Sequence, residues 1–389
     1  MKRFLAAALA VAVLCGSALA GTVKVGVIGP FSGPFALAGK NFKAGIDAYM
    51  ALNGASVDGN DVEIVYRDLP QPDPAKSAAL AQELVVKQGV QYLAGFYFTP
   101  NAMAAAALTE PGNVPMVIFN AATSSIVEKS PFVVRTSFTM WQNTLPMTKV
   151  AFERGMRRVA TVVSDYGPGI DAENAFRTGF AQQGGAVVDS VRLPLSTTDF
   201  SAIMQRIKDS GADAVFAFLP SGPPTLGFVR ASEENGLKAA GVTLLATGDL
   251  TQEPDLAAYG DSALGLLTTY HYSIAHDSPE NLAFVAAGRA AIGNPGDLTF
   301  PAVGAFDGMH VIYAMIAATG GQKNASVAVD AVRGMAWTSP RGPVSIDPAT
   351  RHITQNVYLR EVAKAADGTY YNREIETFAQ QGDPGLMAQ

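Results

Sequence analysis

Apolar and polar positions alternate in blocks along the first 130 residues. Short apolar runs, typical of buried parallel strands, are separated by longer stretches in which apolar residues recur at helical spacing. The strands are predicted at 22–28, 62–66, 91–95 and 115–119. The helices are predicted at 37–52, 74–87, with Asp73 as N-cap, and 101–108. Strands and helices that alternate through short loops predict a parallel sheet with helices on both faces.

The same pattern restarts after residue 140. A helix is predicted at 141–153, and Asp199 is expected to cap a later helix that ends near residue 209. The strands of this second set are predicted at 158–164, 186–193, 212–218, 243–247 and 266–272. The two sets show no obvious sequence repetition, but their order of elements is alike. We therefore predict an α/β protein with two similar doubly wound lobes.

The C-terminal part mixes long helices with strands. Helices are predicted after the cap Asp277-Ser278 and at 301–318 and 327–334, and strands at 344–346 and 352–362. The last dozen residues are polar and are expected to fray. No low-complexity linker is present, so short strand-like crossings should join the lobes. We assign 21–138 with 272–345 to the first lobe, and 139–271 with 346–389 to the second.

Two polar turns follow apolar strands of the first lobe. They are Gly95–Asn101 and Asn120–Ser125, and they carry the hydroxyls of Thr99, Thr123 and Ser124. The crevice beyond the carboxyl ends of parallel strands is where an open α/β sheet binds its ligand. Hydroxyls and helix-start amides suit a small anion such as a carboxylate. Ordinary helix capping explains the same residues equally well at this point.

The N-terminus has the pattern of a secretory signal peptide. Met1-Lys2-Arg3 is basic, an apolar run follows, and Ala18-Leu19-Ala20 fits a cleavage site. The apolar run is shorter than the roughly 20 residues that span a bilayer. A lipoprotein would have to use Cys15, but Leu14 stands where a small residue would be expected. We therefore expect cleavage after Ala20 and release into the periplasm.

Cysteine content and net charge exclude several classes of site and partner. Cys15 is the only cysteine, so the mature chain would hold no disulfide, thiolate metal site or cysteine nucleophile. Without Lys2 and Arg3, the 28 basic residues become 26 against 34 acidic residues, a net charge of −8. Nucleic-acid binding needs concentrated positive charge and is therefore not expected.

Catalytic signatures are weak. Gly29-Pro-Phe-Ser-Gly33 lacks the spacing of a nucleophile elbow, and Gly167-Pro-Gly169 lacks the rest of a dinucleotide fingerprint. The four histidines are scattered without metal-ligand spacing. His271 stands between two tyrosines, where a structural role is favoured. We expect no cofactor, no metal and no enzyme activity.

Six segments, in order, carry a family resemblance. They are Val-Lys-Val-Gly-Val-Ile-Gly-Pro-Phe-Ser-Gly-Pro at 23–34, Gly95 with its hydroxyl turn, Asn-Ala-Ala-Thr-Ser-Ser at 120–125, Val-Ser-Asp-Tyr-Gly at 163–167, Asp-Phe-Ser at 199–201 and Ala-Val-Gly-Ala-Phe-Asp at 302–307. Together they make the chain resemble periplasmic substrate-binding proteins of ABC importers, in the leucine/isoleucine/valine-binding group of the type I periplasmic-binding fold. The resemblance implies two Rossmann-like lobes, joined by a three-strand hinge, that close on the ligand.

The resemblance also implies site residues. Thr99, Ala121 or Ala122, and Thr123 match the positions that hold the ligand carboxylate. Tyr166 matches the tyrosine that lines the side-chain pocket. Asp249 is the best match to the acidic residue that takes the ligand amino group.

One departure affects the choice of ligand. Amino-acid binders of the family place a tyrosine near Pro220, where this chain reads Pro-Ser-Gly-Pro-Pro. A branched-chain or other apolar amino acid and an aromatic or aliphatic acid without an amine both stay open. Tyr97 and Phe98, with Phe96, would shape the apolar part of the site, although strand-end aromatics belong to a core as often.

The function predicted from sequence is capture of a small carboxylate between two lobes and its delivery to a membrane ABC permease, by a monomer. The alternatives are a ligand-sensing receptor component of the same fold and a secreted hydrolase. The signal peptide and the weak catalytic signatures argue against these two.

Overall fold

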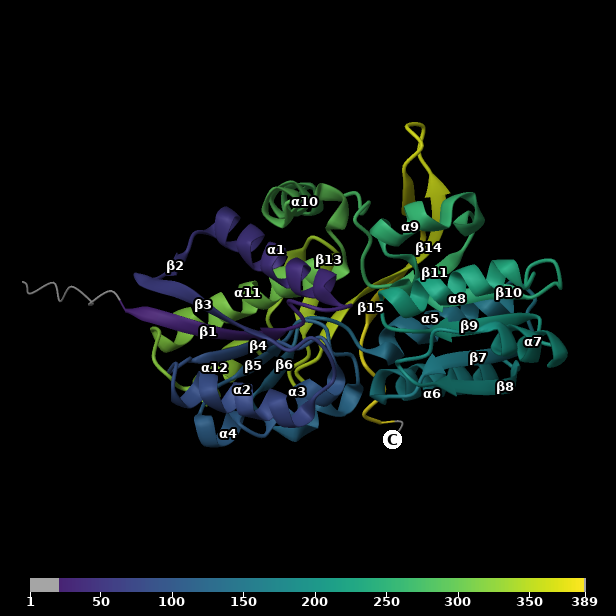
Figure 1. The fold of residues 1–389 in the computed structure, drawn as a ribbon. Coiled ribbons are helices and arrows are strands. Elements are labelled where there is room, and N and C mark those ends of the chain that lie inside the picture. Colours follow the sequence, from purple (N-terminus) through teal and green to yellow (C-terminus); the bar gives the residue numbers. More distant parts are fainter. Residues whose placement is uncertain (1–20, 388–389) are drawn as a thin grey trace, which may run out of the picture.

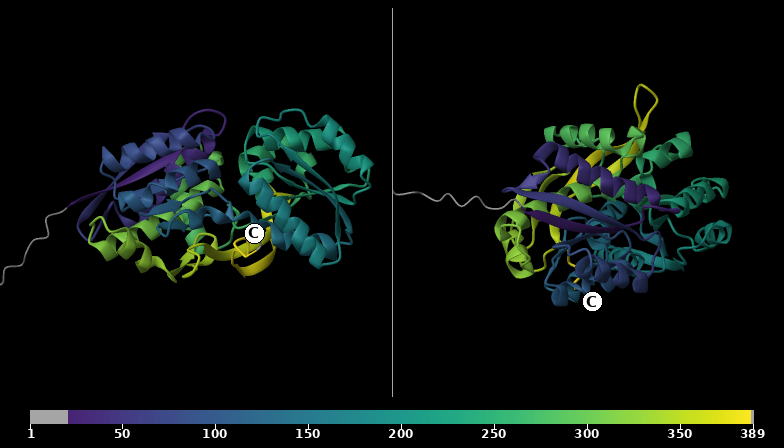
Figure 2. Two further views of the ribbon diagram at one scale, coloured as in Figure 1. Left: turned by 90° about the horizontal axis from the view of Figure 1, so that it is seen from below. Right: turned by 60° about the vertical axis from the view of Figure 1, so that its left-hand side comes forward.

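Within residues 21–387, two β-sheets organise the chain into two lobes that lie side by side (Figures 1 and 2). This computed structural model describes residues 21–387, so the predicted signal peptide at 1–20 lies outside the described residues. Each sheet is mostly parallel and carries helices on both faces. The predicted two-lobed α/β fold is thereby confirmed.

The first sheet contains β1 (Thr22–Gly29), β2 (Ser56–Val57), β3 (Asn60–Asp68), β4 (Tyr92–Gly95), β5 (Met116–Ile118) and β6 (Val133–Arg135). Its order is β2-β3-β1-β4-β5-β6, and its pairs are parallel except for β2 with β3. The inner strands β1, β4 and β5 are buried on both faces, which is why they read as mostly apolar runs.

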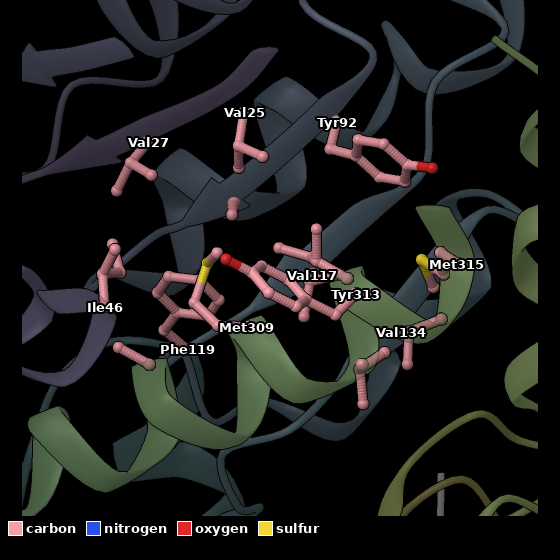
Figure 3. Close-up of a cluster of buried hydrophobic side chains, with 14 of the residues drawn as sticks. Val25, Val27, Ile46, Tyr92, Val117, Phe119, Val134, Met309, Tyr313 and Met315 are labelled. Atoms are coloured by element: carbon pink, nitrogen blue, oxygen red, sulfur yellow. The ribbon is translucent and has the colours of Figure 1, made fainter. Parts of the chain in front are cut away.

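Helices cover the first sheet on both sides. One face carries α1 (Ala36–Asn53), α11 (Phe300–Thr319) and α12 (Ala325–Val332), and the other carries α2 (Pro74–Val86), α3 (Thr99–Ala106) and α4 (Thr109–Gly112). Figure 3 shows the core on the α11 side, where Val25 and Val27 of β1 face Met309 and Tyr313. Although α11 is long and apolar enough to cross a membrane, 78% of its most apolar window is buried inside the protein.

The second sheet contains β7 (Arg158–Ser164), β8 (Ala186–Leu193), β9 (Ala214–Phe218), β10 (Thr243–Thr247), β11 (Leu267–Tyr270), β12 (Ala336–Ser339), β13 (Gly342–Ile346), β14 (Ile353–Lys364) and β15 (Tyr370–Gln381). Its order is β12-β13-β14-β11-β10-β9-β7-β8, and β15 pairs with β14. The strands from β7 to β11 are parallel, and β12 to β15 run antiparallel to their neighbours.

The second lobe also has helices on both faces. One face carries α5 (Met140–Glu153) and α6 (Gly167–Gln182), and the other carries α7 (Ser201–Asp209), α8 (Pro223–Glu234) and α9 (Glu253–Tyr259). Helix α10 (Pro279–Ile292) packs against α1 of the first lobe. Short 3₁₀ turns complete the fold at η1 (Ser124–Lys129), η2 (Gly248–Thr251), η3 (Gly260–Ala263) and η4 (Pro295–Asp297).

Helix starts follow local capping chemistry. The Asp73 side chain accepts a hydrogen bond from the Lys76 amide at the start of α2, and Ser278 does the same for α10, as predicted. Asp199 was expected to be the N-cap of α7, but the N-cap is Phe200. Asp199, one residue before the N-cap, accepts a hydrogen bond from the Ser201 amide at 2.9 Å. The helix therefore starts one residue later than predicted.

The chain passes between the lobes after β6, after β11 and through β12 to β14. Strand β14 reaches into both lobes: Ile353 packs in the core of the first, whereas Leu359 and Val362 pack in the second. The lobes therefore share connecting strands such as β14. The residue numbers at which the sequence analysis divides the lobes stay a prediction.

A buried ion pair holds these crossings together. Arg341, between β12 and β13, donates to the Asp307 carboxylate of α11 at 2.7 Å, and both side chains are fully buried. The same guanidinium donates to the carbonyls of Thr136 and Ser137 and to Gln355 Oε1. Arg341 thus binds residues from the crossing after β6, from α11 and from β14.

The expectation that the last dozen residues fray was wrong for those that the structure describes, 378–387. Strand β15 pairs with β14 as far as Gln381, and the following Asp383 side chain is buried. The pattern of β15 was missed because it is an edge strand whose side chains are largely exposed and polar, so little apolar periodicity marks it. The short strands β6 and β12 were missed for their length.

Candidate ligand-binding cleft

The carboxyl ends of strands from the two lobes enclose a cavity at their interface. In this closed arrangement its volume is only about 10 Å³, which is roughly the space of one water molecule. It is lined by Tyr97, Asn120, Ala122, Phe138, Met140, Tyr166, Pro168, Phe218, Pro220 and Asp249. No Lys, Arg or His lines it in the described chain. Its lining suits a small, largely apolar molecule, and the lobes must move apart to make room for one.

A sharp turn after β4 positions the first-lobe side of the cavity. Gly95 and Phe96 both have positive φ values, and a Cβ on Gly95 would lie 2.4 Å from the Ile28 carbonyl oxygen. Glycine is therefore required at this close approach. The turn directs Phe96 and Phe98 into the core of the first lobe, whereas Tyr97 lines the cavity.

Thr99 and Thr123 come together at the edge of the cleft. Thr123 Oγ1 donates to Thr99 Oγ1 at 3.1 Å, and both side chains are buried. They lie against the first residue of α6, because a Cβ on Gly167 would come within 2.5 Å of Thr123 Oγ1. The two hydroxyls of one lobe therefore face the start of a helix in the other.

The two alanines of the predicted site have different surroundings. Ala122 lines the cavity. Ala121 packs in the core of the first lobe, and its amide already donates to the Phe96 carbonyl at 2.9 Å. Of the eight residues predicted from sequence, Tyr97, Ala122, Tyr166 and Asp249 line the cavity, Thr99 and Thr123 lie at its α6 edge, and Phe98 and Ala121 point away.

The second lobe contributes an aromatic wall. Tyr166 precedes α6, and its ring stacks on Phe218 at the end of β9, with centroids 6.2 Å apart. The turn that lacks the family tyrosine begins at Pro220, which also lines the cavity. Its next residue, Ser221, accepts a hydrogen bond from the Tyr97 hydroxyl through its carbonyl at 3.3 Å. This contact bridges the lobes, so the cleft is closed.

Asp249 is the acidic residue of the cavity. Its side chain is buried, and Thr247 Oγ1 donates to its Oδ2 at 2.9 Å. Burial raises the pKa of Asp249 to about 7, an effect that the Thr247 hydrogen bond and the positive charge of Arg360 oppose. In its ionised form, Asp249 can accept a hydrogen bond from a ligand hydroxyl or ammonium group, and a nearby ammonium group would favour that form.

Some lining residues were missed from sequence. Asn120 lies two residues after β5, and Phe218 ends β9, so the rule that found Thr99 and Thr123 could have found them. Phe138 and Met140 lie at the crossing after β6, and no local pattern marks them. His271 stacks on Phe138, with ring centroids 4.5 Å apart, and burial lowers its pKa well below the usual value, consistent with the structural role expected for it.

Other chemistry is not apparent in the described part of the chain. Residues 21–387 contain no group of three or more His, Cys, Asp or Glu side chains arranged to hold a metal ion.

Known proteins resemble this chain over nearly its full length. The model of a family described as periplasmic binding protein matches residues 22–369. The Leu/Ile/Val-binding protein homolog 6 of Brucella melitensis biotype 1 is 68% identical over 390 residues, covering 100% of both chains.

Solved structures give the same result. An ABC transporter solute-binding protein from R. palustris, in complex with 4-hydroxybenzoate, is 62% identical with a TM-score of 0.93, covering 95% of this chain and 100% of its own. A solute-binding protein from Rhodopseudomonas palustris BisB5, in complex with 3,4-dihydroxybenzoic acid, is 41% identical with a TM-score of 0.88, covering 94% and 99%. The chain therefore belongs to the periplasmic binding protein family, as a non-catalytic solute-binding protein of an ABC transporter.

Proposed function

We propose that this protein captures an aromatic carboxylic acid that carries a ring hydroxyl, of the 4-hydroxybenzoate type. The observation that carries the proposal is the cavity lining: the rings of Tyr97, Phe138, Tyr166 and Phe218 surround a small space that also contains the hydrogen-bond acceptors of Asn120 and Asp249. Relatives that are 62% and 41% identical bind hydroxylated benzoates, which supports the same ligand class here.

The ligand's two ends would meet different groups. The carboxylate would lie toward Thr99, Thr123 and the start of α6, where hydroxyls and free helix amides favour an anion without a lysine or arginine. The ring would pack between aromatic side chains, and the hydroxyl would reach an acceptor. The mature protein, released by cleavage after Ala20, would act as a monomer and deliver the acid to a membrane permease.

A branched-chain amino acid is the second candidate. The name of the relative that is 68% identical favours it, and Asp249 could accept an ammonium group. The absence of the tyrosine near Pro220 weighs against it.

A ligand panel tests the choice. The mature chain from Gly21 is titrated calorimetrically with 4-hydroxybenzoate, 3,4-dihydroxybenzoate, benzoate, leucine, isoleucine and valine. A true ligand at 100 times its dissociation constant should stabilise the fold by about 2.7 kcal/mol in a parallel unfolding experiment. Binding of the hydroxybenzoates in preference to the amino acids is expected, and the reverse order would overturn the proposal.

A variant tests the carboxylate end. Thr123→Val should weaken every carboxylate ligand by roughly 1–3 kcal/mol, because a buried hydroxyl contact is lost. Thr338→Val, at an exposed position of β12, is the matched control and should bind normally. An unchanged affinity in Thr123→Val would remove this hydroxyl from the site.

A further inference from the structure

We propose that Asn120 determines ligand specificity, through an amide oxygen that accepts a hydrogen bond from the ligand's ring hydroxyl. This inference rests on the function proposed above and names a residue that sequence reasoning did not place in the site. Asn120 lies two residues after the end of β5 and lines the cavity.

The orientation of the Asn120 amide is fixed by its neighbour. Nδ2 donates to the Tyr97 carbonyl at 3.0 Å, an interaction that only the nitrogen end can make. Oδ1 is therefore held at the other end of the amide, where it is buried and has no hydrogen-bond partner in the protein. A residue that lines the cavity thus carries a fixed, unsatisfied acceptor.

An unsatisfied buried acceptor discriminates between ligands. A ligand that brings a hydroxyl to Oδ1 restores the lost hydrogen bond, whereas one without a donor leaves the oxygen desolvated and unpaired. Sites built to bond a substrate hydroxyl reject the analogue that lacks it far more strongly than apolar pockets reject a missing methylene. Asn120 should therefore separate 4-hydroxybenzoate from benzoate.

The test compares these two acids in two proteins. The dissociation constants of both are measured for the wild type and for Asn120→Leu, which keeps the side-chain shape without the oxygen. The wild type should prefer 4-hydroxybenzoate at least tenfold. The preference should fall to within about threefold in Asn120→Leu, through weaker binding of 4-hydroxybenzoate.

Controls make the result decisive. Asn53→Leu is the matched control, because the Asn53 amide also donates to a backbone carbonyl but lies at the exposed end of α1. This variant should keep the wild-type preference for 4-hydroxybenzoate. Should Asn120→Leu fail to fold, Asn120→Ala takes its place. A folded variant with an unchanged preference overturns the role of Asn120 alone, whereas a wild type that binds neither acid overturns the proposed function as well.

A separate set of contacts carries a second inference. We infer that residues 382–387, called here the C-terminal strap, form an additional connection between the lobes that favours the closed cleft. The strap leaves β15 of the second sheet, and its Leu386 packs against the core of the first lobe formed around α2 and α3.

The strap meets the first lobe next to the ligand turn. Asp383 Oδ1 accepts from Ser124 Oγ at 3.0 Å and from Thr139 Oγ1 at 2.9 Å, and Oδ2 lies 3.1 Å from His352 Nε2. Gly385 passes so close that a Cβ would lie 2.2 Å from Ser124 Oγ. One carboxylate thus contacts the residue after Thr123 and residues from two crossings.

Ser124 is also held from the second lobe. Its backbone amide donates to the Asp171 carboxylate of α6 at 2.9 Å, and this contact requires the lobes to be together. The strap fixes the hydroxyl of the same residue. By ordering Ser124, the strap should stabilise the arrangement in which Asp171 can reach its amide, which is a shift toward the closed state.

Small-angle scattering of ligand-free protein tests the strap. A chain that ends at Gln381 should have a larger radius of gyration than the wild type, because more molecules are open. A chain that ends at Leu386 keeps the contacts of Asp383, Gly385 and Leu386, loses Met387, which is 92% exposed, and is the matched control. Asp383→Asn, which keeps the chain length, should shift in the same direction as the truncation.

The strap inference does not depend on the ligand. Equal radii for the wild type, the truncated chain and Asp383→Asn would overturn it, whatever the protein binds. Should the truncated chain fail to fold, Asp383→Asn alone decides. For any ligand found in the panel, the dissociation rate should rise roughly fivefold or more in Asp383→Asn, within the usual range of coupling between sites.

Discussion

At the scale of single residues, this cleft combines neutral hydrogen-bond donors with one acidic and one amide acceptor. Hydroxyls and helix amides gather near Thr123, whereas Asp249 and Asn120 offer oxygens elsewhere in the same cavity. A monocarboxylate with one hydroxyl matches such a division. The global net charge says nothing about this pattern, because a few groups within hydrogen-bond reach outweigh distant charges screened by solvent.

Sequence reasoning found part of this set. Thr99 and Thr123 follow strands in a parallel sheet, so the strand-end rule places them correctly beside the cleft. The same rule applied to Asn120 and Phe218 would have added them. Phe138 could not be found in this way, because it lies in a crossing whose path depends on both lobes.

A buried carboxyl predicts pH dependence. Burial, with a contribution from nearby Glu253, raises the pKa of Asp255 to about 7. The folded protein then holds a proton that the unfolded chain releases near pH 4, so this stabilising contribution is present below pH 4 and is lost as the pH rises toward 7. Asp255→Asn removes the effect.

Urea unfolding at pH 4 to 7 measures the pH dependence. The free energy of unfolding of the wild type, relative to Asp255→Asn, should fall over this range by at most about 4 kcal/mol. Asp171 and Asp249 also have raised pKa values, but they contribute to both proteins and cancel in the difference. Parallel curves would contradict the prediction.

At the scale of elements, the strong apolar runs were assigned correctly. The predicted ranges 158–164, 186–193 and 243–247 coincide with β7, β8 and β10. Strands β7 and β10 are central in the sheet and mostly apolar, whereas β8 is an edge strand whose apolar run is interrupted by Asp189 and Arg192. Strand β15 was not predicted because its own sequence has little apolar alternation. Its extended conformation depends on pairing with β14.

The start of α6 shows how an element controls the cleft. Gly167 leaves room for Thr123 Oγ1, which a Cβ would approach to 2.5 Å. Gly167→Ala should therefore hinder closure and weaken ligand binding severalfold, with a small effect on the stability of the ligand-free protein.

A second glycine-to-alanine substitution is the control for Gly167→Ala. Gly296→Ala adds a Cβ at a glycine whose nearest neighbour would lie 3.7 Å away, an ordinary contact, so its affinity should equal that of the wild type. Calorimetric titration with the best ligand of the panel measures both. Equal affinities in the two variants would show that the lobes close without the space at Gly167.

At the scale of the whole molecule, the buried Asp307–Arg341 pair ties the crossings into one unit. Removal of one partner leaves an uncompensated buried charge, which commonly costs about 3–5 kcal/mol. Arg341→Met should accordingly lower the free energy of unfolding by about that amount. Denaturant unfolding is the measurement.

An exposed pair supplies the contrast. Arg333 contacts Asp330, whose side chain is 67% exposed, and such pairs contribute only about 0–1 kcal/mol. Arg333→Met should therefore be nearly neutral. A similarly small effect of Arg341→Met would mean that the hinge does not depend on this ion pair.

The sequence by itself determined the alternation of strands and helices, the division into two similar lobes and the turns that carry Thr99 and Thr123. These features depend on local apolar period and on turn chemistry, which act over a few residues. Only the tertiary structure decided which side chains share the cavity, how Arg341 joins the crossings, and that Asp383 reaches Ser124. Those contacts join residues 30 to 260 positions apart, and the packing of two lobes, rather than any local pattern, brings them together.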